Sequence, residues 1–316
     1  MAQTERHTVL ILGAGASVPY GFPTGTELVS AIHKEYPSLL RGHVASTDQA
    51  SSHAEEFCAE LDGAGNKSID TFLEFAEGLR KTGALAIALT MLYRERPGTL
   101  SNVNRADPDN WYRELINWLY PSPDVQFPAS TVSVITYNYE RSLEQYMYTA
   151  LSDRLKRMQK RPTNAAELMG RVPIIHVHGR FGRLYWQQGD GEPVPYDWER
   201  VAKDANLIQS AADNIMIAFN PQIEKSKALQ EARDRLSTAT HIIFLGFGYD
   251  ERNIRRLFQP NPIVAGHVHV VGTAFGLNKL EVRDATNMLK TYVVESFVEL
   301  RPLKNCEFIT ETGCFR

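Results

Sequence analysis

Near the amino terminus stands Thr8-Val9-Leu10-Ile11-Leu12-Gly13-Ala14-Gly15-Ala16-Ser17, the stretch that decides the fold. Its five apolar or β-branched residues predict a buried strand, and two glycines separated by one residue predict a sharp turn into a helix. Gly13 permits the reversal, Gly15 lets the backbone approach a pyrophosphate closely, and amides at the helix start supply donors, to which Ser17 adds a hydroxyl. We therefore predict a nucleotide-binding turn, with a merely tight strand-to-helix connection as the alternative.

Similar apolar runs recur along the chain. They lie at 8–12, 132–136, 174–177, 242–246, 268–272 and 292–297. Stretches with helical periodicity, such as 221–239 and 277–290, separate most of them. Parallel strands that are buried on both faces have this continuous apolar character, and helices form their crossovers. The sequence predicts an α/β fold with a doubly wound, Rossmann-like parallel sheet.

The first crossover is too long to be one helix, because roughly a hundred residues precede the second strand and a βαβ unit takes about 30. We predict an inserted small helical subdomain at 31–130, with 1–30 and 131–316 forming the Rossmann domain. The Ser-, Gly- and Ala-rich segment 42–66 predicts a flexible connection. Helices are expected at 69–79, 85–93 and 111–119.

Composition excludes several classes of protein. The 316 residues have average apolar and charged fractions, which indicates a globular chain, and neither a membrane span nor a signal peptide is indicated, so we expect a cytoplasmic protein. Three scattered cysteines form neither a disulfide framework nor paired zinc knuckles. A net charge of −3 gives no general attraction to nucleic acid, so direct binding to nucleic acid is not expected. A local basic cluster, expected to be a solvated helix face, consists of Arg154, Lys156, Arg157, Lys160 and Arg161.

The glycine turn departs from the usual dinucleotide fingerprint. That fingerprint has a third glycine where this chain has Val18, and an acidic residue at the end of the following strand. Glu35 falls instead within a predicted helix. A standard dehydrogenase is therefore disfavoured.

Three further motifs follow predicted strands at their carboxyl ends, where open α/β sheets bind ligands. They are Thr136-Tyr137-Asn138-Tyr139-Glu140, Val177-His178-Gly179 and Gly246-Phe247-Gly248-Tyr249-Asp250. With the glycine turn and Gly21-Phe22-Pro23-Thr24, they occur in the order found in sirtuins. From Gly13 to about Gly272, outside the helical insertion, the chain resembles the sirtuin-like NADases of the bacterial antiphage-defence type.

The resemblance implies NAD as the substrate and cleavage of its bond to nicotinamide. By position, Asn138 contacts the nicotinamide ribose and helps to place the attacking water, and His178 acts on the ribose hydroxyls or the nucleophile. These two are the expected catalytic residues. The implied NAD-binding residues are Gly13, Ala14, Gly15, Ala16, Ser17, Pro23, Thr24, Gly179, Gly246, Phe247, Gly248 and Asp250.

The chemistry independently favours these residue types. Cleavage builds oxocarbenium character at C1′, and nicotinamide leaves as a good neutral group, so a strong general acid is unnecessary. A positioned water and polar contacts on the ribose are needed, and an amide and an imidazole provide them.

Each of these residues has a purely structural alternative. Asn138 is a candidate cap for a helix starting near Tyr139, His178 a strand-edge histidine bonded to backbone, and Asp250 a cap for the next helix. The pairs His176/His178 and His267/His269 are each two apart on a strand and raise the question of a metal site. Without a supporting Cys or carboxylate, we expect no metal.

The chain also departs from the family. The stretch 180–213 contains no cysteine, whereas deacylating sirtuins carry a zinc module there, and its turns suggest a hairpin or loop. Glu140 stands where many relatives have Asp, and Gly272-Thr273 where sirtuins have an Asn for the adenosine ribose.

Three functions follow as alternatives. The first is an NAD glycohydrolase that depletes NAD in antiphage defence by abortive infection, the second an NAD-dependent ADP-ribosyl transferase or deacylase, and the third a non-catalytic NAD-binding scaffold. The resemblance further implies a homo-oligomer, activated by a separately encoded ATPase partner or by a phage-derived trigger.

Overall fold

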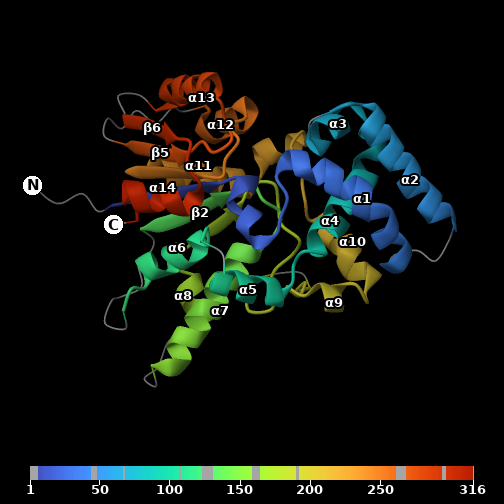
Figure 1. Ribbon diagram of the computed structural model, residues 1–316, viewed down its shortest axis with the longest axis horizontal. Coiled ribbons are helices and arrows are strands. Elements are labelled where there is room, and N and C mark those ends of the chain that lie inside the picture. Colours follow the sequence, from blue (N-terminus) through green and yellow to red (C-terminus); the bar gives the residue numbers. More distant parts are fainter. Residues whose placement is uncertain are drawn as a thin grey trace, which may run out of the picture.

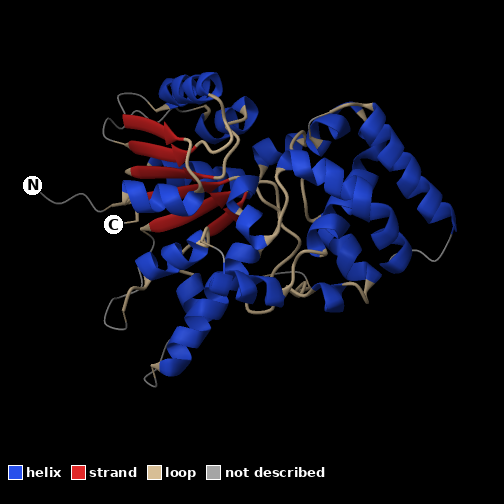
Figure 2. Cartoon of the chain, in the orientation of Figure 1, coloured by secondary structure: helices blue, strands red, loops and turns tan. Residues whose placement is uncertain are grey.

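The fold was analysed in a computed structural model, which describes residues 6–43, 48–66, 68–106, 108–122, 131–158, 164–189, 192–260, 268–293 and 297–315. At its centre is a six-stranded parallel sheet in the order β3-β2-β1-β4-β5-β6 (Figure 2). The strands are β1 (Thr8–Leu12), β2 (Val132–Thr136), β3 (Ile174–His176), β4 (His241–Leu245), β5 (His269–Thr273) and β6 (Phe297–Arg301). The strand order reverses between β1 and β4, which is the arrangement of dinucleotide-binding sheets.

The central strands are buried on both faces, as their sequences require. Every residue of β1 and of β2 is buried. Leu10 and Leu12 face one apolar core, whereas Val9 and Ile11 face another. β1 pairs in register with β2 and β4, so that Leu12 lies beside Thr136 and Leu245. The carboxyl ends of these three strands therefore meet at one edge of the sheet.

Helices cover both faces. The first face packs against α6 (Trp111–Leu119), α7 (Ser142–Arg157), α8 (Ala165–Met169) and α14 (Asn305–Thr312). The second packs against α11 (Lys227–Ser237), α12 (Glu251–Phe258) and α13 (Lys279–Tyr292). This three-layer arrangement confirms the predicted doubly wound α/β fold (Figure 1).

A helical lobe lies beyond the carboxyl ends of the strands (Figure 1). It contains α1 (Gly25–His43), α2 (Asp48–Gly63), α3 (Ile69–Phe75) and α4 (Arg80–Leu92), with α1 contacting the other three. Two later helices, α9 (Trp198–Val201) and α10 (Ala205–Asp213), belong to the same layer, since α10 contacts both α9 and α4. α5 (Pro97–Ala106) connects this layer to α6.

Most predicted elements are confirmed, and two expectations were wrong. The segment 42–66, expected to be flexible, contains α2. The segment 180–213, expected to form a hairpin or loop, begins as a loop and then forms α9 and α10. The last strand is β6 at Phe297–Arg301, whereas Tyr292 ends α13.

The basic cluster is only partly a solvated face. Arg154 donates to the carbonyls of Ile116 and Tyr120, which ties α7 to the end of α6. Lys160 and Arg161 lie outside the described residues. None of the described helices is both long enough and apolar enough to cross a bilayer.

Candidate functional site

The glycine turn after β1 does not lead directly into an α-helix, contrary to the sequence prediction. Two short 3₁₀ turns follow, η1 (Ala14–Ala16) and η2 (Val18–Tyr20), and α1 begins only at Gly25. Four amides of the turn donate within the protein: Gly13 to Leu245 O, Gly15 to Gly246 O, Ala16 to Gly13 O and Ser17 to Ala14 O. These four amides are therefore already engaged within the protein, and the Ala14 amide is not among them.

The glycines of the turn are needed for a close contact with the β4 loop. A Cβ at Gly13 would lie 2.6 Å from the Gly246 carbonyl oxygen, and one at Gly15 would lie 2.9 Å from Gly246 Cα. Gly246 itself has a φ of +56°, and a Cβ there would overlap the Ala16 amide nitrogen. Two loops that follow neighbouring strands thus pack backbone against backbone, which only glycine permits.

We predict that Gly246→Ala lowers the free energy of unfolding by at least ~3 kcal/mol, because it combines a left-handed backbone with a steric overlap. Gly248→Ala in the same loop is the matched control, since a Cβ there meets no atom within 4 Å. Its cost should stay below ~1 kcal/mol. Urea unfolding of both variants measures the difference, and equal costs would contradict the proposed packing role of Gly246.

Asn138 lies immediately after β2 and is held at three of its polar groups. Its backbone N–H donates to Thr136 Oγ1 (3.1 Å), and its Nδ2 donates to Gly13 O (3.1 Å) and Ser17 Oγ (2.8 Å). Its carbonyl oxygen lies 2.8 Å from His176 Nδ1. Because a carbonyl only accepts, the contact with Gly13 fixes the amide orientation. The side chain is no helix cap, since α7 begins at Ser142.

The side-chain oxygen Oδ1 of Asn138 has no hydrogen-bond partner among the described residues, although the residue is only 8% exposed. An acceptor held in a fixed orientation at the carboxyl edge of the sheet is suited to a water or a sugar hydroxyl.

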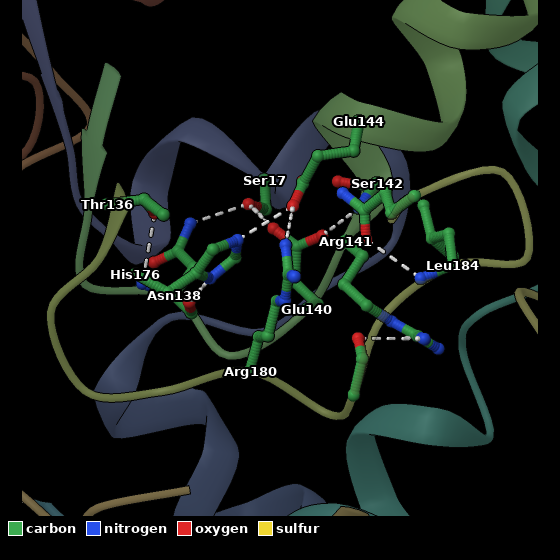
Figure 3. Close-up of polar contacts among 12 residues, drawn as sticks. Ser17, Thr136, Asn138, Glu140, Arg141, Ser142, Glu144, His176, Arg180 and Leu184 are labelled. Carbon is green, nitrogen blue, oxygen red and sulfur yellow. Dashed lines mark hydrogen bonds and ion pairs between the residues drawn. The ribbon is translucent and has the colours of Figure 1, made fainter. Parts of the chain in front are cut away.

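Glu140 holds the serine that contacts Asn138. Its Oε1 accepts from Ser17 Oγ (2.5 Å) and its Oε2 from the Ser142 amide (2.5 Å). Burial raises the pKa of Glu140, and the hydrogen bonds from Ser142 and Ser17 only partly offset that rise. The longer carboxylate thus keeps the local hydrogen bonds expected of it, and it links β1, β2 and α7 (Figure 3). The Ser17 hydroxyl, expected to face a ligand, is used inside this network.

His178 follows β3, buried and neutral. Its ring lies edge-on to Tyr137 at 5.0 Å and tilted against Tyr139 at 6.3 Å. Burial, with a smaller contribution from the positive charge of Arg256, lowers its pKa to about 3. Nε2 is buried and has no hydrogen-bond partner among the described residues. An unpaired buried nitrogen costs free energy unless a ligand or a water satisfies it.

The depressed pKa of His178 predicts acid destabilisation. Because the folded chain binds this proton far more weakly than the unfolded chain, whose imidazole titrates near the ordinary value of 6.5, stability falls as the pH drops below 6.5. This group alone should remove ~2 kcal/mol between pH 7 and pH 5. The check is urea unfolding of wild type and His178→Asn at both values. An equal loss in both proteins would show that His178 does not hold the neutral state described.

The other expected site residues gather at the same edge, with varied roles. Thr24 and Glu27 cap α1, and Asp250 caps α12 by accepting from the Asn253 amide, as its structural alternative proposed. Gly179, with a φ of +77°, forms a bridge with Ile215.

The remaining residues pack around the β4 loop. Phe247 lies 5.4 Å from the Tyr137 ring, and Pro23 is half-buried just ahead of α1. Thr273, where the family places Asn, accepts from the Gly246 amide at 2.8 Å and so holds the β4 loop.

Sequence reasoning missed a second polar cluster next to Asn138. His176 Nε2 lies 2.8 Å from Glu144 Oε1, and Arg180 Nη1 lies 3.9 Å from that same oxygen. The His-x-His pattern draws attention to His176 but does not indicate its partner Glu144, which lies on α7. Figure 3 shows the three side chains converging from β3, α7 and the loop after β3.

A buried ion pair fixes the loop that follows this cluster. Arg141 and Glu95 are 0% and 1% exposed at their side chains and form a salt bridge. Arg141 also donates to the carbonyls of Gly182, Val194 and Pro195. Gly182, Val194 and Pro195 are therefore held by Arg141, the residue immediately before α7.

Within the described ranges, no three His, Cys, Asp or Glu side chains are grouped so that they could hold a metal ion. His176 contacts Glu144, His269 stacks on His241 at 5.4 Å, and His267 lies outside the described residues. No family model matches this chain, and no curated protein matches it either.

Proposed function

We propose that this protein is an NAD glycohydrolase, which converts NAD and water into nicotinamide and ADP-ribose. The observation that carries the proposal is that Asn138 Oδ1 and His178 Nε2, from residues that follow the neighbouring strands β2 and β3, have no hydrogen-bond partner among the described residues. Sheets with this strand order bind dinucleotides in the crevice outside the carboxyl ends of the strands. The motif order that resembles sirtuin-like NADases supports the same substrate.

In the proposed reaction the C1′–N bond breaks, and its electron pair leaves with nicotinamide, which becomes neutral. The ribosyl cation then adds water at C1′ and releases one proton. Asn138 Oδ1 accepts a hydrogen bond from the attacking water, and the neutral His178 ring contacts a ribose hydroxyl. With a pKa near 3, His178 is a weak base, so its task is orientation more than proton removal.

The glycine turn has a more limited part in this proposal. Four of its amides already have acceptors in the protein, so they reach a phosphate only by exchanging these bonds. Its clearest task is to hold Asn138, through Gly13 O and Ser17 Oγ. The other NAD contacts are proposed for Ala14, Pro23, Thr24 and the β4 loop.

We further propose that NAD depletion serves antiphage defence, and that activation depends on a homo-oligomer, an ATPase partner or a phage-derived trigger. The roles in defence and activation rest on the family resemblance. The cytoplasm is the proposed location, because the sequence indicates neither a membrane span nor a signal peptide.

The test is chromatographic analysis of NAD incubated with the protein, alone and with lysate from phage-infected cells. Nicotinamide and ADP-ribose in equal amounts, without an added acceptor, support the glycohydrolase. Turnover only with a protein or acyl-lysine acceptor would indicate the transferase or deacylase. NAD binding without turnover in every condition would indicate the scaffold.

A further inference from the structure

We propose that His176 is a positioning residue, which holds Asn138 in its working orientation while its ring is anchored by Glu144. The kinetic consequence rests on the proposed function, whereas the hydrogen-bond geometry does not. Neither His176 nor Glu144 is among the catalytic and NAD-binding residues expected from the sequence.

The geometry places His176 between two acceptors. Nδ1 lies 2.8 Å from the Asn138 carbonyl oxygen, and Nε2 lies 2.8 Å from Glu144 Oε1. The two side chains of the pair are 4% and 3% exposed, so water does not compete for these bonds. His176 is thus the link from α7 through β3 to the residue after β2.

The proton on Nδ1 follows from its partner. A carbonyl oxygen only accepts, so Nδ1 carries a proton and donates it to Asn138. Burial alone would raise the pKa of Glu144, but its interaction with His176 and the charge of Arg180 outweigh burial, and the net pKa lies below its ordinary value. The contact of Nε2 with Glu144 Oε1 fixes the other edge of the ring.

Ionisable groups surround the ring. Glu144 on α7 faces the ring directly, with Arg180 of the following loop 3.9 Å from the same carboxylate. Glu140 and Glu95 are buried near Glu144, and burial raises the pKa of each. His176 thus lies among three buried carboxyl groups and the guanidinium groups of Arg141 and Arg180.

The bond from His176 matters because Asn138 is fixed by its neighbours and not by a regular element. Its amide, its carbonyl and its Nδ2 are each held by a different side chain or loop. If the carbonyl lost its donor, the loop would shift to satisfy it, and the Oδ1 position would shift with it. A displacement of about 1 Å costs roughly 10²-fold in rate.

A purely structural ion pair that ties β3 to α7 is the competing interpretation, and two amide variants separate the two. His176→Asn places an amide nitrogen near the Nδ1 position and keeps the bond to Asn138, while losing Glu144. His176→Gln places it near Nε2 and keeps Glu144, while losing Asn138. A structural pair predicts that Gln is the better replacement, and positioning predicts Asn.

The experiment uses NMR on the full chain with labelled histidine and asparagine, together with NAD kinetics. In wild type the Nδ1 proton of His176 should be protected from exchange by its bond to the Asn138 carbonyl oxygen. The Asn138 Nδ2 protons should lose protection from exchange in His176→Gln and keep it in His176→Asn. kcat should fall roughly 10²-fold in the Gln variant, with KM within about threefold, and less than about tenfold in the Asn variant.

An unprotected Nδ1 proton of His176, or equal Asn138 protection in the two variants, would overturn the inference. So would a larger kcat loss for His176→Asn than for His176→Gln. If wild type turns over no NAD, the proposed function fails by itself, and the ring protons and the Asn138 exchange rates still decide the positioning role.

Discussion

Asn138→Ala is expected to reduce kcat for NAD cleavage by about 10³-fold, which is within the range for losing a group that orients the reacting water. The change removes the free Oδ1 acceptor, and it also leaves Gly13 O and Ser17 Oγ without the Nδ2 donor. NAD affinity should change less than tenfold, because the rest of the dinucleotide keeps its contacts. Initial rates and calorimetric binding measure the two quantities separately.

Asn164→Ala is the control for the loss of an asparagine. Asn164 caps α8, which leads into the amino end of β3, so its loss should cost stability and leave kcat unchanged.

His178→Ala should reduce kcat for NAD cleavage as Asn138→Ala does. Its matched control is His241→Ala, since His241 also has a pKa lowered to about 4 but lies at the amino end of β4. Full activity in Asn138→Ala would remove that residue from the proposed mechanism.

Arg141→Met is expected to destabilise the fold by ~3–5 kcal/mol, the usual cost of removing one partner from a buried ion pair. Glu95 would remain as an unpaired carboxylate at 1% exposure. Three loop carbonyls, those of Gly182, Val194 and Pro195, would lose their donor at the same time. Urea unfolding gives the free-energy change.

The double variant Arg141→Met/Glu95→Leu separates the charge from the loop contacts. Without the stranded carboxylate, it should recover more than half of the lost stability, and the remainder measures the three carbonyl contacts. A single variant Arg141→Met within ~1 kcal/mol of wild type would show that the ion pair does not organise this loop.

The sheet was predictable because its strands are buried on both faces and therefore have continuous apolar sequences. β1 and β2 were predicted with their observed bounds. The helix α2 was missed because composition was weighed above periodicity. Its buried residues Ala54, Phe57, Cys58 and Leu61 recur at helical spacing, so the signal was present in the sequence.

The meeting of the motifs at one edge of the sheet was predictable, whereas their contacts were less so. Motifs after parallel strands must meet at one edge, which brought Asn138 and His178 to the expected place. The contact of Gly13 and Gly15 with Gly246 was not predictable, since a glycine required by another backbone looks the same as one required by a phosphate. The pairing of Arg141 with Glu95 and of His176 with Glu144 depends on tertiary packing, for which one sequence has no local signal.

The most direct measurement is a crystal structure with a non-hydrolysable carbocyclic NAD analogue. The proposed function predicts that the nicotinamide-bearing ring lies at the carboxyl edge of β1, β2 and β3. Asn138 Oδ1 and His178 Nε2 should each lie within hydrogen-bond distance, about 3.5 Å or less, of a ring hydroxyl or an ordered water beneath C1′. An analogue bound elsewhere, or at this edge with both atoms still unpartnered, would contradict the proposal.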